Sequence, residues 1–154
     1  PRTFSSAASD VYKRQGYGVK GEFTNNGVDN PTKFTPGTIG YARVALNDGG
    51  GAYFITVTDM PRLDGNYAAF GRVTEGLELA RQISRMEAEP IAEGMPIHRA
   101  VNPVTVGTIR VDTFGVEYPE PEKLPLPAPE ELEAAVIAEL QKSMEKAKPK
   151  AAQE

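Results

Sequence analysis

The prolines of this chain are unevenly placed, and their positions limit what each part of the chain can become. Five of the 13 prolines lie between residues 119 and 129. Proline has no backbone N–H and a fixed φ angle, so such a run interrupts both helices and sheets and forms an extended, semi-rigid spacer. We therefore expect a sheet-forming body over residues 16–118, a linker over 119–129, and a separate segment after it.

The first 15 residues differ from the body in character. They show neither strand nor helix periodicity and no apolar face. Residues 10–15, Asp-Val-Tyr-Lys-Arg-Gln, are what the end sequence of a widely used transposase library adapter encodes. We interpret residues 1–15 as an adapter-derived leader and exclude them from fold reasoning, with a natural disordered N-terminus as the alternative. On the first interpretation, the natural chain began upstream of Gly16 and part of the protein is missing.

The body is expected to be mainly β. Residues 53–58 are rich in β-branched and aromatic side chains, and we predict further strands over 38–44 and 68–73. The Asp-Gly pair at 64–65 predicts a turn between two of these strands, because glycine adopts positive φ at little cost. Residues 104–114 alternate between apolar and polar side chains, with one slip near Gly107, which predicts a half-buried strand with a bulge.

One helix is expected within the body. Thr74 is a candidate N-cap for a helix over residues 75–84. Three apolar side chains would share one face of that helix: Leu77, Ala80 and Ile83. Residues 86–103 are expected to form a proline-containing loop. This order of elements favours a mostly antiparallel β-structure with one helix.

The segment after the linker predicts a C-terminal helical tail. Residues 130–148 place acidic side chains in the first turn and lysines in the last, as the helix dipole favours. A narrow apolar stripe recurs every four residues: Leu132, Val136, Leu140 and Met144. The helix would dock on the body or fray, with a dedicated partner site as the alternative. Residues 149–154 are expected to be a disordered end.

Composition and charge exclude several classes of chemistry. The chain has no cysteine and one histidine, which rules out disulfides, thiol nucleophiles and sites with several histidines. The net charge is −4, yet the first 115 residues carry 12 basic and 12 acidic side chains. A neutral body gives no electrostatic footprint for nucleic acid, and the longest apolar runs are far too short for a membrane span. We expect a cytoplasmic protein without nucleic-acid or membrane partners.

Three local signals invite functional interpretations. Residues 16–21 match G-x-G-x-x-G, but the sequence around them lacks the strand and helix that dinucleotide binding requires, so we interpret them as a loop. His98 is expected to be a solvated loop residue. Asp59 and Asp64 bracket a predicted turn, where backbone capping is a better interpretation than an acid–base pair.

Four short runs then follow one another in an order and spacing that resemble the cyclophilin-type peptidyl-prolyl isomerases. The most specific is residues 63–73, Leu-Asp-Gly-Asn-Tyr-Ala-Ala-Phe-Gly-Arg-Val, and the others are residues 21–23, 40–43 and 50–55. The resemblance covers residues 16–118 and is strongest to short bacterial members. It implies an antiparallel β-barrel capped by helices. This chain would hold about half of the strands, one of the helices and the helical tail.

The resemblance also implies an activity, the cis–trans isomerisation of X-Pro peptide bonds that assists protein folding. The uncatalysed rotation barrier is on the order of 20 kcal/mol. Such an enzyme stabilises the twisted amide through an apolar proline pocket, backbone partners and a cationic donor near the imide nitrogen. It needs no cofactor, metal or covalent intermediate. Its partners would be proline-containing peptides and unfolded protein clients.

Seven substrate-binding residues follow from the resemblance by position: Tyr41, Ala42, Arg43, Ala52, Phe54, Leu63 and Tyr67. Phe54 would form the floor of the proline pocket, with Leu63 and Tyr41 as further apolar wall. Ala42 and Arg43 would face the bound peptide. Ala52 stands where the family usually has Gln, and Tyr67 where many members have His, so substrate positioning would differ from the family pattern.

The family's catalytic arginine lies in a Phe-His-Arg segment upstream of the region that matches Gly16, and nothing in residues 1–15 matches it. Arg43 and Arg62 align with other positions and are not assigned that role. We therefore expect no catalytic residue in this chain, which alone would be poorly folded and inactive. The alternatives are a non-catalytic proline-peptide-binding or chaperone module, and an interaction protein that acts through the helix over 130–148.

Overall fold

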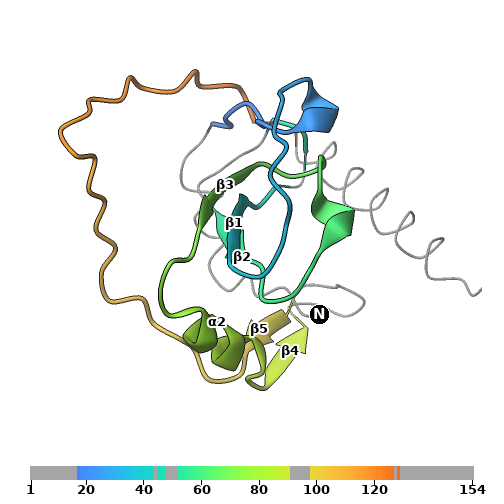
Figure 1. Ribbon diagram of the computed structural model, residues 1–154, viewed down its shortest axis with the longest axis vertical. Helices are drawn as coiled ribbons and strands as arrows, with labels where there is room; N and C mark the ends of the chain where they lie inside the picture. Colours follow the sequence, from blue (N-terminus) through green and yellow to red (C-terminus); the bar gives the residue numbers. More distant parts are fainter. Residues whose placement is uncertain (1–16, 44, 48–51, 91–97, 127, 129–154) are drawn as a thin grey trace, which may run out of the picture.

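A three-stranded antiparallel sheet forms the centre of the computed structural model, which describes residues 17–43, 45–47, 52–90, 98–126 and 128 (Figure 1). The middle strand β1 (Thr38–Tyr41) pairs with β2 (Tyr53–Ile55) on one side and with β3 (Ala69–Arg72) on the other. All three strands lie inside the ranges that their composition predicts. Each observed strand is shorter than predicted.

The pairing register places the one glycine of β1 opposite an aromatic residue. Gly40 lies opposite Phe54 of β2, and the register against β3 shifts between Ile39 and Gly40. Such a shift is typical of a β-bulge, which bends and twists the strand locally. The sheet therefore curves around the aromatic side chains that lie against Gly40.

The remaining elements are short. Two 3-10 helices, η1 (Thr24–Asn26) and η2 (Pro61–Leu63), flank the sheet, and α2 (Leu77–Ser84) follows β3. A hairpin of β4 (Ala88–Pro90) and β5 (His98–Ala100) closes the folded part. Within the described ranges the fold is thus mainly β, with one α-helix and no closed barrel, which confirms the expected fold class.

The core of the described residues is small, and three of its buried residues lie outside its main cluster: Phe23, Ala68 and Ala100. Phe34, Met60 and Ala69 are buried together, and Phe54, Leu63 and Tyr67 pack against them. The polar groups beside this cluster are satisfied. The Thr38 hydroxyl donates a hydrogen bond to the Lys33 carbonyl at 3.0 Å, and the buried Thr56 hydroxyl lies 2.5 Å from the Thr35 carbonyl. Buried hydroxyls that find such partners avoid the cost of desolvation.

Two predictions about the helix region have different outcomes. The apolar face of α2 is confirmed, because Leu77, Ala80 and Ile83 are all partly buried. The N-cap is not Thr74 but Gly76, which has a φ of 80° and makes no side-chain cap bond. Glycine adopts this left-handed conformation without strain, so the chain turns into the helix two residues later than the cap pattern suggests.

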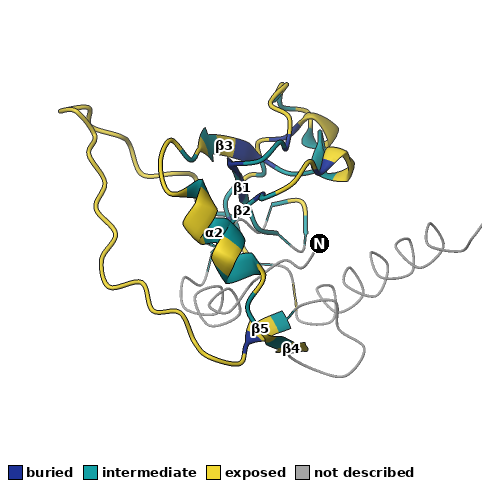
Figure 2. Cartoon of the chain, turned by 60° about the horizontal axis from the view of Figure 1, so that its bottom comes forward, coloured by how far each residue is buried: buried dark blue, intermediate teal, exposed yellow. Residues whose placement is uncertain are grey.

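Two other predictions are wrong. Residues 86–103 do not form only a loop, because β4 and β5 pair within them, and His98 lies in β5 opposite Pro90. Residues 104–114 form no strand and are exposed throughout (Figure 2). The side-chain alternation is present, but no described segment pairs with it, and a strand exists only where its backbone groups find a partner.

The leader, the helical tail and the end of the chain, residues 1–15, 130–148 and 149–154, lie outside the described residues. In the part of the chain that the structure describes, no helix has the length and apolar character needed to cross a membrane.

Candidate functional site

Three aromatic rings form the centre of the candidate site. Phe34 and Phe54 stack with their centroids 5.5 Å apart, and the Tyr67 ring meets Phe54 edge-on at 5.7 Å. Both arrangements stabilise an aromatic pair by more than the burial of its apolar area alone would. Phe34 is 2% exposed whereas Phe54 and Tyr67 are only partly buried. The cluster thus has a buried floor and an accessible apolar face.

Gly40 provides the space in which this stack sits. A Cβ atom at this position would lie 2.5 Å from Cε1 of Phe34 and 2.6 Å from Cζ of Phe54. Carbon atoms in contact normally keep about 3.5–4.0 Å between them. The absence of a side chain at Gly40 therefore lets both rings lie directly against the backbone of β1.

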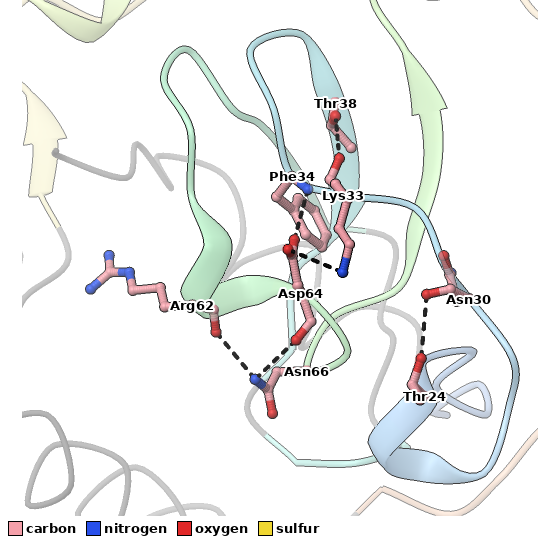
Figure 3. Close-up of polar contacts among 8 residues, drawn as sticks. All are labelled: Thr24, Asn30, Lys33, Phe34, Thr38, Arg62, Asp64 and Asn66. Carbon is pink, nitrogen blue, oxygen red and sulfur yellow. Dashed lines mark hydrogen bonds and ion pairs between the residues drawn. The ribbon is translucent and has the colours of Figure 1, made fainter.

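Asp64 fastens the loop that carries Phe34 to the turn after η2. Its Oδ1 accepts a hydrogen bond from the Phe34 amide at 2.9 Å, and its Oδ2 lies 3.6 Å from Nζ of Lys33 (Figure 3). In the same turn Gly65 has a φ of 70°, as the Asp-Gly pair predicts. The carboxylate of Asp64 thus binds the backbone amide of Phe34, which agrees with a capping function. Asp64 is therefore not available to form an acid–base pair with Asp59.

We expect Asp64→Ala to lower the free energy of unfolding by about 1–2 kcal/mol, because the amide of Phe34 would lose its acceptor at a buried position. Urea denaturation followed by circular dichroism measures this change. Asp59→Ala is the matched control, because the side chain of Asp59 is exposed. Equal effects of the two substitutions would contradict the assigned role of Asp64.

Arg43 is packed between two rings. Its Cζ lies 4.6 Å from the centroid of the Phe23 ring and 4.7 Å from that of Tyr67. Nε and Nη2 donate to the carbonyl oxygen of Asn66 at 2.8 and 2.6 Å. A guanidinium group suits this arrangement because it is planar, stacks on aromatic faces and donates through a rigid fork. Arg43 thereby fixes the position of Tyr67.

Tyr41 lies on the other face of β1. Successive side chains of a strand point to opposite faces, and Gly40 faces the stacked rings. Tyr41 instead packs against Phe70, with ring centroids 5.4 Å apart. These two rings line a shallow hollow of about 100 Å³ together with Phe23 and Arg43. That volume is well below the ~300 Å³ at which small-molecule pockets begin, so the hollow has room for one side chain.

The two alanines contribute backbone. The Ala42 amide donates to the Ala52 carbonyl at 2.9 Å, which extends the β1–β2 pairing by one residue. The structure therefore brings Phe54, Leu63 and Tyr67 together, places Ala42 and Ala52 beside each other, and separates Tyr41 from the cluster.

Three side chains of this region were absent from the predicted set: Phe23, Phe34 and Met60. Phe34 lies in a loop without strand or helix periodicity, so no local pattern predicts its burial. Its position before a predicted strand is the only signal in the sequence, and it does not say which ring Phe34 would meet.

The other motifs carry no site within the described residues. Gly18 of the glycine motif forms an isolated bridge with Leu124, and the next element, η1, has only three residues. No group of three or more histidine or carboxylate side chains in the described ranges is arranged to hold a metal ion.

The sequence matches the family profile described as cyclophilin type peptidyl-prolyl cis-trans isomerase/CLD over residues 3–109. The match begins within the segment 1–15 and ends before residue 118. It does not test the boundaries expected for the body, which remain predictions.

Curated relatives agree with this match over shorter stretches. The chain is 40% identical over 55 residues to peptidylprolyl isomerase domain and WD repeat-containing protein 1 of Homo sapiens. It is 36% identical over 58 residues to a peptidyl-prolyl cis-trans isomerase of Helicobacter pylori, and 28% identical over 101 residues to peptidyl-prolyl cis-trans isomerase D of Saccharomyces cerevisiae. These alignments cover 36%, 36% and 64% of this chain, and 8%, 36% and 44% of the respective relatives. The chain thus spans less than half the length of these three relatives.

Proposed function

The chain belongs to the cyclophilin-type peptidyl-prolyl cis-trans isomerase family, and we propose that it recognises X-Pro peptides as part of an isomerase that assists protein folding. The observation that carries this proposal is the partly exposed apolar surface of Phe54, Leu63 and Tyr67 above the buried ring of Phe34. A proline ring is apolar and rigid, so it gains contact with such a surface at little entropic cost.

The rigidity of this surface supports a binding role. Phe54 is fixed from below by Phe34, and Tyr67 is fixed by Arg43, which is itself bonded to the Asn66 carbonyl. A preformed surface loses little conformational freedom when a ligand arrives. The backbone of the bound X-Pro peptide would run past residues 42–43, which directly follow the end of β1.

The chemistry needs no covalent step. Rotation about the X-Pro bond breaks the conjugation of the amide, and binding that favours the twisted form lowers a barrier on the order of 20 kcal/mol. A cation near the imide nitrogen would stabilise that form. Arg43 is engaged by Asn66 and two rings, and Figure 3 shows the Arg62 side chain extending away from Phe34. Neither is assigned the catalytic role, so we assign binding to this chain.

Titration of the ¹⁵N-labelled chain with a short peptide that contains one Ala-Pro bond tests the proposal. We expect chemical-shift changes to centre on Phe54, Leu63 and Tyr67. Phe54→Ala should weaken binding about tenfold or more, because the proline ring loses its main contact surface. Tyr53→Ala is the matched control, since Tyr53 is the neighbouring aromatic residue of β2, is 49% exposed and points to the opposite face.

Phe54→Leu accompanies these variants, because it keeps most of the packing volume while it removes the flat ring. Equal affinities of the Phe54 and Tyr53 variants, or shift changes confined to other residues, would overturn the proposed surface. Exchange spectroscopy on the same samples measures the isomerisation rate separately. Binding without a rate gain is expected here, whereas a clear gain would show that this chain catalyses the isomerisation by itself.

A further inference from the structure

Among the described residues, the chain leaves the folded body after β5 and pairs with it again at Leu124. Ala100 is 6% exposed, residues 101–123 are exposed throughout, and Leu124 then lies antiparallel to Gly18 (Figure 1, Figure 2). The Gly18 amide donates to the Leu124 carbonyl at 2.8 Å, and the Leu124 amide donates to the Gly18 carbonyl at 2.9 Å. Residues more than a hundred positions apart in sequence thus exchange both backbone hydrogen bonds.

The prolines near this bridge all lie at odd positions, and Lys123 occupies the remaining odd position. Every proline between residues 119 and 129 occupies an odd position: Pro119, Pro121, Pro125, Pro127 and Pro129. In an extended chain, successive N–H groups point to opposite edges. All the even residues therefore keep an amide on one edge, whereas the other edge has lost most of its donors.

The bridge uses the edge that has kept its donors. Leu124 occupies an even position and makes both hydrogen bonds, while the neighbouring Pro125 sits where an N–H would point away from Gly18. The proline therefore costs the pairing nothing. It also prevents a further strand from pairing on the outer edge, which is how natural sheets protect their exposed edges.

Side chains beside the bridge add to the contact. Nζ of Lys123 lies 5.2 Å from the centroid of the Tyr17 ring and 2.8 Å from Oε2 of Glu120. The hydrogen bond with Lys123 lowers the pKa of Glu120, and the same bond raises the pKa of Lys123. Both groups keep their charges at neutral pH, so Lys123 stays a cation over the Tyr17 ring.

We propose that residues 119–126 form a one-sided β-strap, a segment of this chain that binds the backbone edge at Tyr17 and Gly18 and caps it. The pairing depends on the amide and carbonyl of Leu124, and the odd-numbered prolines close the outer edge. The strap is independent of X-Pro recognition by the aromatic cluster, so either proposal stands if the other fails.

Amide hydrogen exchange in the full chain tests the strap with two variants that each add one proline, one position apart. Leu124→Pro removes an inward-facing N–H, and we expect the Gly18 amide to lose about tenfold or more of its protection. Lys123→Pro adds a proline at an outward-facing position and also removes the ammonium group over Tyr17, so Lys123→Ala is its reference for the lost side chain. We expect the protection of the Gly18 amide in the Lys123→Pro chain to stay within about twofold of that in the Lys123→Ala chain. The amide of Thr56, which donates to the Thr38 carbonyl at 2.9 Å, reports in the same sample whether the sheet is intact.

A peptide in trans supplies the second measurement. A synthetic peptide with the sequence of residues 118–128 should restore the protection of Gly18 in the Leu124→Pro chain. A peptide of the same composition with its prolines moved to even positions should not. The proposal is overturned if Gly18 is unprotected in the native chain, if Lys123→Pro costs as much protection as Leu124→Pro, or if both peptides act alike.

Discussion

Replacing Phe34 with alanine is expected to lower the free energy of unfolding by about 3–5 kcal/mol, the usual cost of emptying a buried aromatic position. Phe34 is 2% exposed, stacks on Phe54 and packs with Met60 and Ala69. The core of this chain is small, and domains are stable by only about 5–15 kcal/mol in all. The substitution should therefore remove a large part of the stability, and Phe54 should lose its support.

Urea denaturation followed by circular dichroism measures the loss. Phe114→Ala is the matched control, because Phe114 is 88% exposed and its removal empties no core. We expect the control to change the free energy of unfolding by less than about 0.5 kcal/mol. A loss at Phe34 no larger than at Phe114 would show that the stacked rings do not form the core.

Gly40→Ala should produce the second large effect, a destabilisation of about 3 kcal/mol, at the upper end of what overpacking costs. The new Cβ would lie 2.5 Å from Cε1 of Phe34 and 2.6 Å from Cζ of Phe54. Phe34 is 2% exposed and stacks on the partly buried Phe54, so the new methyl group has to displace one of the two rings. Displacement of the Phe54 ring should also weaken the binding of X-Pro peptides.

The matched control is Gly71→Ala on the neighbouring strand β3. A Cβ at that position would lie 3.6 Å from Cδ1 of Ile39, an ordinary contact distance. Adding Phe34→Leu to the Gly40→Ala chain should recover part of the stability, because the smaller side chain makes room for the new methyl group. Additive effects of the two substitutions would contradict the assigned clash, because residues in direct contact do not behave additively.

The central sheet was predictable because its signals are local. The β-branched and aromatic residues of β2 and the Asp-Gly turn before β3 express their preferences within a few residues. The exposed segment 104–114 has an equally clear alternation and forms no strand. Side-chain alternation says which face of a strand would be buried, but it does not supply a neighbouring backbone.

The candidate site was predictable only in part. Phe54, Leu63 and Tyr67 were expected from the family resemblance, and the structure brings them together. Tyr41 was assigned to the same wall but lies on the opposite face, because the neighbouring Gly40 is the residue that faces the rings. Phe34, the buried floor, was absent from the predicted set, since its loop has no periodicity.

Four properties depend on neighbouring residues and can be read from the amino-acid order: the strand propensities of the sheet, the turn after η2, the neutral body and the proline-rich segment. Which groups meet depends on the folded chain. It placed Phe34 against Gly40, Arg43 between Phe23 and Tyr67, and Leu124 against Gly18. These contacts join residues distant in sequence, so their formation depends on how the whole chain closes on itself.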